Sequence, residues 1–220
     1  MAGPPPLIAI VDYGIGNLHS AHKGFEHVGA DARLTADHEL IRRADGVVLP
    51  GVGAFGPCMT ALTERGLDGV VREVIDAGRP FFGICIGMQL LARASEEAPG
   101  VAGLGVLDAE VRRLPEGVRR PQIQWNVVER RRPHPLFEGL DDPVWMYFVH
   151  SYALEDGPAV IATCDYGGPQ AAALARGDLW AAQFHPEKSG RAGLRVLANF
   201  VELAARRRAS VGAGDPGGQR

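Results

Sequence analysis

The sequence predicts an α/β fold, with a central mixed, largely parallel twisted sheet flanked by helices and with added antiparallel strands. Two observations support this prediction. In the first half of the chain, short apolar runs alternate with helical patterns, which is typical of parallel strands buried on both faces. Between residues 104 and 184, strand patterns follow one another closely through turns, which indicates antiparallel or mixed strands.

In the first half, each predicted buried strand ends in a turn that contains Gly or Cys, and a helical pattern follows it. The expected strands are residues 7–11, 45–49 and 80–85. The expected helices are residues 18–28 and 87–94, and further helical segments are expected between residues 57 and 77. Because crossovers between parallel strands are right-handed, these helices should cover both faces of the sheet.

In the second half, the clearest strand patterns are residues 144–152, 159–164 and 179–184. Residues 193–207 then form a predicted helix with one apolar face. We expect residues 7–207 to be a single domain. The Pro-rich start, residues 1–6, should be flexible, and the polar, Gly-rich tail, residues 208–220, should be disordered.

Charge and cysteine content exclude several classes of protein. The formal net charge of −3 gives no general attraction to nucleic acid or anionic membranes. The arginine runs 130–132 and 206–208 lack interleaved aromatic residues, so we interpret them as solvated surface. Three cysteines are too few for a disulfide framework, and the apolar run 7–11 is too short for a signal peptide. We therefore expect a cytoplasmic protein.

A cysteine lies at the predicted junction between a buried strand and a helix. Gly83-Ile84-Cys85-Ile86-Gly87 has the form of the hydrolase elbow G-x-S-x-G, with cysteine in place of serine. Such a turn presents the central side chain at the carboxyl edge of the sheet, where open α/β sheets bind ligands. A helix N-terminus favours an anion, so Cys85 is a candidate thiolate nucleophile. The alternative is a buried structural cysteine, which we expect for Cys58 and Cys164.

A histidine and a glutamate follow the predicted strand at residues 179–184. In Phe184-His185-Pro186-Glu187, residues two apart face the same side, and Pro186 places them at a strand end. Glu187 can then accept a hydrogen bond from one imidazole nitrogen while the other nitrogen faces a thiol. Alone, the motif is more often a strand-end histidine followed by a surface glutamate. Together with the elbow cysteine, it favours His185 as general acid and base and Glu187 as its orienting carboxylate.

The loop Pro50-Gly51-Val52-Gly53-Ala54-Phe55 follows the second buried strand and should lie at the same sheet edge as Cys85. Glycine-rich backbone can approach a ligand closely and point N–H groups at it. For acyl transfer, the amides of Val52 and Ile86 are the candidate donors of an oxyanion hole. A plain strand-to-helix turn would favour the same residues, and the loop does not have the phosphate-binding pattern G-x-x-x-x-G-K-[ST].

Five motifs together resemble a known family. They are residues 12–18, 50–56, 83–89, 147–152 and 183–190. With these motifs, the chain resembles the class I (triad) glutamine amidotransferases, whose sheet is flavodoxin-like. Within that family it is similar to the glutaminase subunits of imidazole glycerol phosphate synthases, which act in histidine biosynthesis. The resemblance extends over about residues 7 to 205.

The resemblance implies a reaction in which Cys85 attacks glutamine, giving a glutamyl thioester and ammonia, and water then releases glutamate. His185 and Glu187 complete the implied triad, and neither a metal ion nor a cofactor is expected. The implied substrate-binding positions are Gly51, Gly53, Gln89, His150, Ser151 and Tyr152. From the residues alone, His150 belongs either to the core or to a site, and the sequence does not decide between them.

The resemblance also implies a partner, a (β/α)8 barrel cyclase that forms a heterodimer with this chain. Ammonia would pass through the barrel to a ribulosyl nucleotide, giving imidazole glycerol phosphate and an aminoimidazole carboxamide ribotide. A sealed face is physically sensible, because ammonia released into water is protonated and lost as a nucleophile. The matching docking positions are Asn17, Ile123, Trp125, Asn126, Tyr147 and Lys188.

Some alternatives remain open at this point. Trp125 and Tyr147 could pack in the core instead, and Gln124 stands where the family usually has glycine, which affects the details of docking. A glutaminase that serves another synthase, such as anthranilate, aminodeoxychorismate or pyridoxal phosphate synthase, would carry the same triad. A non-catalytic elbow-cysteine protein, such as a redox sensor or chaperone, would not need the His-Pro-Glu motif.

Overall fold

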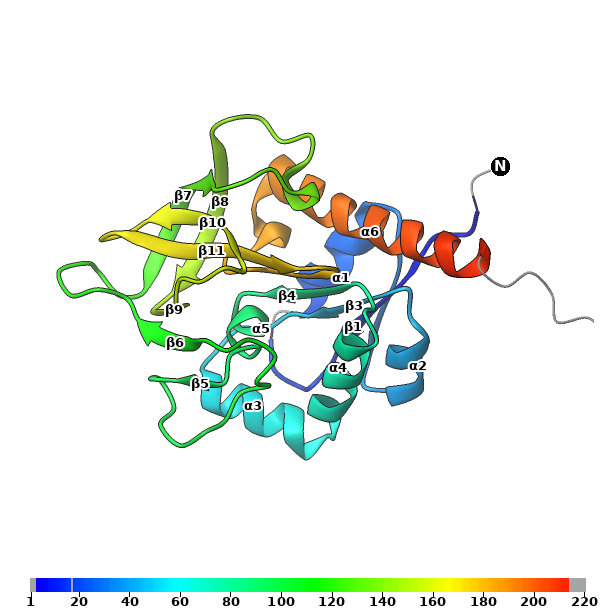
Figure 1. Ribbon diagram of the computed structural model, residues 1–220, viewed down its shortest axis with the longest axis horizontal. Helices are drawn as coiled ribbons and strands as arrows, with labels where there is room; N and C mark the ends of the chain where they lie inside the picture. The colour runs from blue at the N-terminus through cyan, green and yellow to red at the C-terminus, as the bar shows by residue number, and fades with distance from the viewer. Residues whose placement is uncertain (1–2, 17, 214–220) are drawn as a thin grey trace, which may run out of the picture.

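The computed structural model describes residues 3–16 and 18–213, which form one large sheet, one small sheet and the helices around them (Figure 1). The strands of the large sheet are β1 (Leu7–Val11), β2 (Asp31–Thr35), β3 (Gly46–Leu49), β4 (Phe81–Ile84), β7 (Gln122–Arg130), β8 (Val144–His150), β10 (Val160–Asp165), β11 (Pro169–Arg176) and β12 (Leu179–Ala182). Their spatial order is β2-β1-β3-β4-β12-β11-β10-β7-β8.

The large sheet is divided into a parallel part and an antiparallel part. Strands β2, β1, β3, β4 and β12 pair in parallel, whereas β12, β11, β10, β7 and β8 pair with one another in antiparallel fashion. The predicted fold class is therefore confirmed. Because the carboxyl ends of the parallel strands meet at one edge, the loops after β1, β3, β4 and β12 lie close together there.

Helices cover both faces of the sheet. They are α1 (Leu18–His27), α2 (His38–Arg43), α3 (Phe55–Glu64), α4 (Leu67–Asp76), α5 (Ile86–Gln89) and α6 (Gly190–Ala213). In Figure 1, α6 lies above the sheet, and α3 and α4 lie below it. Helices α1 and α6 pack on one face, and α2 to α5 pack on the other, so each face has its own hydrophobic cluster.

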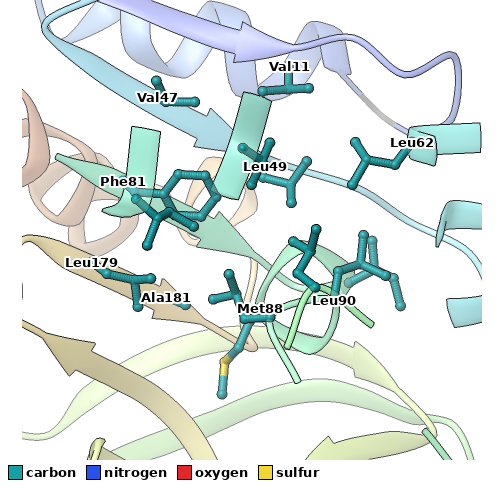
Figure 2. Close-up of a cluster of buried hydrophobic side chains, with 14 of the residues drawn as sticks. Val11, Val47, Leu49, Leu62, Phe81, Met88, Leu90, Leu179 and Ala181 are labelled. Carbon is teal, nitrogen blue, oxygen red and sulfur yellow. The ribbon is translucent and has the colours of Figure 1, made fainter. Parts of the chain in front are cut away.

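The cluster beneath the sheet supports, from below, the edge at which these loops meet. Figure 2 shows Leu49 of β3 and Phe81 of β4 among the side chains that gather with Leu62 of α3 and Met88 of α5. All four of these side chains are inaccessible to solvent. Burying each one contributes roughly 1.5–3 kcal/mol, so the short helix α5 is fixed by packing rather than by its own length.

A small sheet and two short 3-10 helices complete the described chain. The small sheet contains β5 (Ala94–Ser95), β6 (Glu110–Arg113) and β9 (Tyr152–Leu154). The 3-10 helices are η1 (Pro135–Phe137) and η2 (Pro186–Lys188). Strand β9 begins two residues after β8 ends, so the chain passes from the large sheet to the small one at Ser151. Among the described residues, no helix has both the length and the apolar character needed to cross a membrane.

The helix predicted at residues 87–94 is wrong in length, since α5 ends at Gln89. Leu90, Leu91 and Ala92 are fully buried, and their carbonyls accept hydrogen bonds from residues 104, 107 and 105 rather than from a further helical turn. An apolar run enclosed on all sides carries no helical periodicity, and its tertiary partners decide its conformation.

Residues 3–6 and 208–213 make specific contacts or continue a helix, where we expect flexible or disordered chain. Helix α6 continues through residues 208–213, which we assigned to a disordered tail, and Arg208 hydrogen-bonds to the carbonyls of Pro4 and Pro5. Arg208 also pairs with Asp45 at 3.2 Å. The Pro-rich start is therefore tied to the last helix, and arginines interpreted as solvated surface make specific contacts. Residues 214–220 lie outside the described part of the chain.

Candidate active site

Cys85 lies on a strained turn between β4 and α5. Its backbone has φ 54° and ψ −111°, and no other non-glycine residue of the described chain has a positive φ. The Cys85 amide donates to the carbonyl of Ala182 on β12 at 2.7 Å, and its carbonyl accepts from Met88 at 3.0 Å. The strain is thus held by hydrogen bonds to a strand and a helix, as in a nucleophile elbow.

The two glycines of the elbow are required by close packing. A Cβ atom on Gly87 would lie 1.8 Å from the carbonyl oxygen of Leu49 on β3. A Cβ atom on Gly83 would lie 2.9 Å from the carbonyl oxygen of Gly87. The first distance is sterically impossible, so α5 can approach β3 this closely only with glycine at position 87.

His185 and Glu187 form the hydrogen-bonded pair that the sequence predicts. The Nδ1 atom of His185 lies 2.7 Å from Oε1 of Glu187, and the two side chains are only 2% and 4% exposed. Burial acts to lower the pKa of His185, but Cys85 and Glu187 beside the ring outweigh it and raise that pKa to about 10. The imidazole is therefore set up to hold a proton, and its buried Nε2 has no hydrogen-bond partner among the described residues, which leaves that N–H available for transfer.

The backbone around His185 is fixed by strand β8 and by a buried serine. The His185 amide donates to the carbonyl of Tyr147 at 2.9 Å. The hydroxyl of Ser189 donates to the His185 carbonyl at 2.6 Å and accepts from the Tyr147 amide at 3.0 Å. Tyr147 and His185 are thus linked twice, so strand β8 fixes the position of the His185 backbone.

A cavity of about 330 Å³ opens beside Cys85. Its lining includes most of the predicted site residues, namely Val52, Gly53, Cys85, Ile86, Gln89, His150, Ser151, Tyr152 and Lys188. Gly51 does not line it. Its α-carbon packs so closely that a Cβ there would lie 2.0 Å from the Tyr13 hydroxyl and 2.3 Å from Ile86 Cγ2, so Gly51 supports the loop from behind.

His150 belongs to this cavity, which answers the question that the sequence left open. Its Nδ1 lies 2.8 Å from the Tyr152 carbonyl, and a carbonyl only accepts, so Nδ1 carries the proton. Burial lowers the pKa of His150 to about 4, so the ring is neutral near pH 7. Its Nε2 is buried and has no hydrogen-bond partner among the described residues, which leaves an acceptor for a bound molecule.

The two predicted oxyanion donors both line the cavity. Ile86 is the first residue of α5, where backbone N–H groups have no helical partner. Val52 lies in the loop after β3, and its carbonyl is 3.9 Å from the thiol of Cys58. Gly53 next to it has φ 116°, a conformation that favours glycine. Oxyanion binding by these two amides remains a prediction.

Two residues that we did not predict also belong to the site. Gln183 is fully buried, and its Nε2 lies 3.6 Å from the Cys85 sulfur. A glutamine in the otherwise apolar stretch 179–184 was the available signal. Glu97 lines the cavity, and its Oε2 accepts from the Phe55 amide at 2.8 Å. In the sequence, Glu97 resembles an ordinary surface carboxylate, so no signal marked it.

The predicted docking residues that the structure describes lie on or near the outer hairpin β7–β8. Trp125 and Ile123 are 49% and 59% exposed, and Trp145, which we did not predict, is 50% exposed. Trp125 is therefore not a core residue, and its ring meets the half-buried Tyr147 ring at 6.1 Å. These side chains share one face of the hairpin, because Trp125 pairs with Tyr147 and Ile123 pairs with Val149.

The remaining docking positions differ from one another. Lys188 is exposed at the edge of the cavity, whereas the Asn126 side chain donates to the Asp165 carbonyl at 2.9 Å and stabilises a neighbouring turn. Asn17 lies outside the described residues.

Within residues 3–16 and 18–213, no group of three or more His, Cys, Asp and Glu side chains is arranged to hold a metal ion.

Comparison with known proteins agrees with this geometry. The family model for glutamine amidotransferase class-I matches residues 9–203. Imidazole glycerol phosphate synthase subunit HisH from Symbiobacterium thermophilum is 52% identical over 198 residues, which cover 89% of this chain and 93% of that protein. The subunit of the same name from Syntrophotalea carbinolica is 46% identical, covering 90% of this chain and all of that protein (100%).

Solved structures support the fold independently. The structure of PurLQS from Thermotoga maritima matches with a TM-score of 0.73 at 17% identity, covering 90% of this chain and 99% of that one. At this identity the likeness concerns the fold alone. The family model and the HisH relatives establish more than the fold, because this chain matches each relative over nearly the relative's whole length. The chain belongs to the class I glutamine amidotransferases and, within them, to the family of HisH subunits of imidazole glycerol phosphate synthase.

Proposed function

We propose that this chain is the glutaminase subunit of imidazole glycerol phosphate synthase and that Cys85, His185 and Glu187 carry out the hydrolysis. The observation that carries the proposal is the strained Cys85 beside a cavity, next to a buried His185–Glu187 pair joined at 2.7 Å. The Cys85 thiolate attacks the side-chain amide carbon of glutamine. His185, holding the proton, delivers it to the departing nitrogen, so that ammonia leaves and a thioester remains.

The second half of the reaction uses the same groups in reverse. The now neutral His185 takes a proton from water, and the hydroxide attacks the thioester carbon. Collapse of the tetrahedral intermediate breaks the C–S bond and leaves the Cys85 thiolate beside the protonated His185, and the new carboxyl group leaves as glutamate after losing its proton to solvent. In both halves the amides of Val52 and Ile86 stabilise the oxyanion, and the loss of one such donor costs about 10²–10³-fold in kcat.

The cavity offers complementary groups to the rest of glutamine. The Glu97 carboxylate suits the α-ammonium group, and the backbone at Ser151 and Tyr152 suits the α-carboxylate. The bare Nε2 of His150 suits an N–H donor, such as the amide that becomes ammonia. Gln89 donates to Tyr152 and Gln183 through the same Nε2, so its Oε1 is the atom left for a donor on the substrate.

The hydrophobic face of the β7–β8 hairpin supports the proposal of a partner. The relatives are named as synthase subunits, and Ile123, Trp125 and Trp145 present large apolar side chains to solvent. Exposed patches of this kind mark protein interaction sites, and tryptophan is enriched in binding hot spots. We propose that this face, with Lys188, docks a (β/α)8 barrel cyclase that receives the ammonia.

We propose that residues 7–207 act as one glutaminase domain, with the further turns of α6 packing against the chain start. We also propose a cytoplasmic location, which agrees with three cysteines that are all unpaired thiols.

A coupled assay tests the proposed function. The purified chain, mixed with the cyclase and the ribulosyl nucleotide, should make imidazole glycerol phosphate with glutamine as nitrogen donor. Glutamine turnover by the isolated chain should be low and should rise when the cyclase and nucleotide are added. Cys85→Ala should abolish the glutamine-dependent reaction, with a loss of up to about 10⁶-fold, while added ammonia still supports product formation by the cyclase.

The outcomes separate the rival interpretations. In one outcome, the chain releases glutamate with the cyclase but makes no imidazole glycerol phosphate, and instead supports an anthranilate, aminodeoxychorismate or pyridoxal phosphate synthase. That result would assign it to another synthase. Glutamine turnover that survives Cys85→Ala would contradict the triad and favour a non-catalytic role for this cysteine. Full activity of the isolated chain would contradict the proposed dependence on the partner.

A further inference from the structure

Gln183 occupies a position that the reaction described above does not use. It follows β12, where the register with β4 places it beside Cys85, since Ala182 pairs with Ile84. Its side chain is fully buried, yet its neighbours on β12 are apolar. A buried amide is costly unless it is hydrogen-bonded, so its partners indicate why it is there.

The partners of Gln183 fix which end of its amide faces the sulfur. The Tyr152 carbonyl can only accept, so the side-chain atom of Gln89 that lies 2.9 Å from it is the nitrogen. That same nitrogen lies 2.9 Å from Gln183, so the Gln183 atom that it meets is the oxygen. The Gln183 NH₂ group is therefore directed at Cys85, with its nitrogen 3.6 Å from the sulfur.

The hydrogen bonds among Tyr152, Gln89 and Gln183 allow only one orientation of the two side-chain amides. The Tyr152 carbonyl accepts from both Gln89 and His150, at 2.9 and 2.8 Å, which uses both of its lone pairs. Gln89 uses both hydrogens of its amide on Tyr152 and Gln183. Flipping Gln183 would bring two acceptors, its oxygen and the thiolate, together and would face two NH₂ groups toward each other.

We propose that Gln183 is a second stabiliser of the Cys85 thiolate, donating a hydrogen bond to the sulfur from the side of β12 while His185 supplies the opposing charge. The inference rests on the proposed role of Cys85 as nucleophile. A hydrogen bond to an ionised group is worth roughly twice one between neutral groups, so this donor favours the reactive form of the thiol. It also holds the sulfur over the end of β12, next to the cavity.

Other titratable groups also surround the sulfur, and the test must leave them unchanged. They are His185 and Glu187 after β12, His150 on β8, Tyr13 after β1, Cys58 on α3, and Glu97 and Lys188 at the cavity. Replacing Gln183 alters none of them directly. A shift in the pH dependence of Cys85 reactivity is therefore a specific readout of the amide.

The experiment measures the rate of alkylation by iodoacetamide against pH, with peptide mapping to assign the signal to Cys85. In Gln183→Met, which keeps the volume but removes the donor, the midpoint of the alkylation profile should rise by about one pH unit. In Gln183→Glu, which places a carboxylate beside the sulfur, the rise should be larger. Glutamine turnover with the cyclase present should fall in both variants.

A matched control is available in Gln122→Met. Gln122 is also fully buried, but it lies beside Cys164, so this variant removes a buried amide that does not touch the Cys85 sulfur. Its alkylation midpoint should equal that of the wild-type protein. Thermal unfolding of all variants separates loss of folding from the effect on the thiol.

The outcomes are decisive in either direction. Raised midpoints in both Gln183 variants, with an unchanged control, support the proposal. An unchanged midpoint in folded Gln183→Met or Gln183→Glu overturns it while leaving the triad intact. Because Gln183→Glu is nearly isosteric, it serves if the methionine variant does not fold. Failure of the triad would appear elsewhere, as glutamine turnover that survives Cys85→Ala.

Discussion

Replacing Gly87 with alanine tests whether the nucleophile depends on the close approach of α5 to β3. The new methyl carbon would lie 1.8 Å from the Leu49 carbonyl oxygen, whereas contacts of a Cβ below 3.0 Å do not occur. The elbow must therefore move by at least about 1.2 Å, the difference between 1.8 and 3.0 Å. A misplacement of about 1 Å at a catalytic group can cost about 10²-fold in rate, so we expect at least that loss in glutamine turnover.

The assay is glutamate release in the presence of the cyclase, together with urea unfolding of each variant. Gly69→Ala is a suitable control, since Gly69 lies in α4 and a Cβ there meets nothing within 4 Å. That variant should keep full activity and gain about 0.5 kcal/mol of stability, because alanine favours a helix over glycine. Wild-type activity in Gly87→Ala would refute the account of the elbow.

Three further predictions concern the triad, the docking face and a helix cap. Glu187→Gln should lower glutamate release by up to about 10⁴-fold, because the imidazole loses its orienting charge. The folded-state pKa of His185 is raised from 6.5 to about 10, so its stabilising effect is complete below pH 6.5 and is lost as the pH rises through 10. In urea unfolding, the stability gap between wild type and Glu187→Gln should therefore close over that window, and a constant gap would contradict this. Trp125→Ala should weaken binding of the cyclase by roughly 30-fold in calorimetry and leave unfolding nearly unchanged, whereas Arg33→Ala at the opposite sheet edge should alter neither. Asp37→Ala removes the side chain that accepts from the Leu40 amide at 2.9 Å, and should cost about 1 kcal/mol in unfolding.

The parts of the fold that could be predicted from the sequence are those in which periodicity and burial agree. Apart from Asp45, the runs 7–11, 45–49 and 80–85 contain no charged or polar amide side chain, and they contain β1, β3 and β4 of the parallel part of the sheet. The strands that we did not identify individually have mixed patterns. Strand β7 alternates polar residues with exposed Trp125 and Ile123, and β11 begins at a proline, so neither showed a simple alternation of buried and exposed residues.

The site could be predicted where chemistry depends on short spacing. The elbow glycines and the His-Pro-Glu motif act over a few residues, and the structure joins His185 to Glu187 just after β12, the strand that pairs with β4 before Cys85. Gln183 and Glu97 act through contacts with distant residues. The hydrogen bond from Gln89 to Gln183 joins positions 94 residues apart, and only the folded chain shows that it exists.

The most direct test of the central claim is to trap the acyl-enzyme. The complex with the cyclase is mixed with glutamine, quenched in acid during turnover, and analysed by intact mass and peptide mapping. The account predicts a hydroxylamine-sensitive glutamyl group on Cys85 that accumulates in the wild-type protein and is missing from Cys85→Ala. A glutamyl group on Cys58 or Cys164, or glutamate release by Cys85→Ala at the wild-type rate, would contradict it.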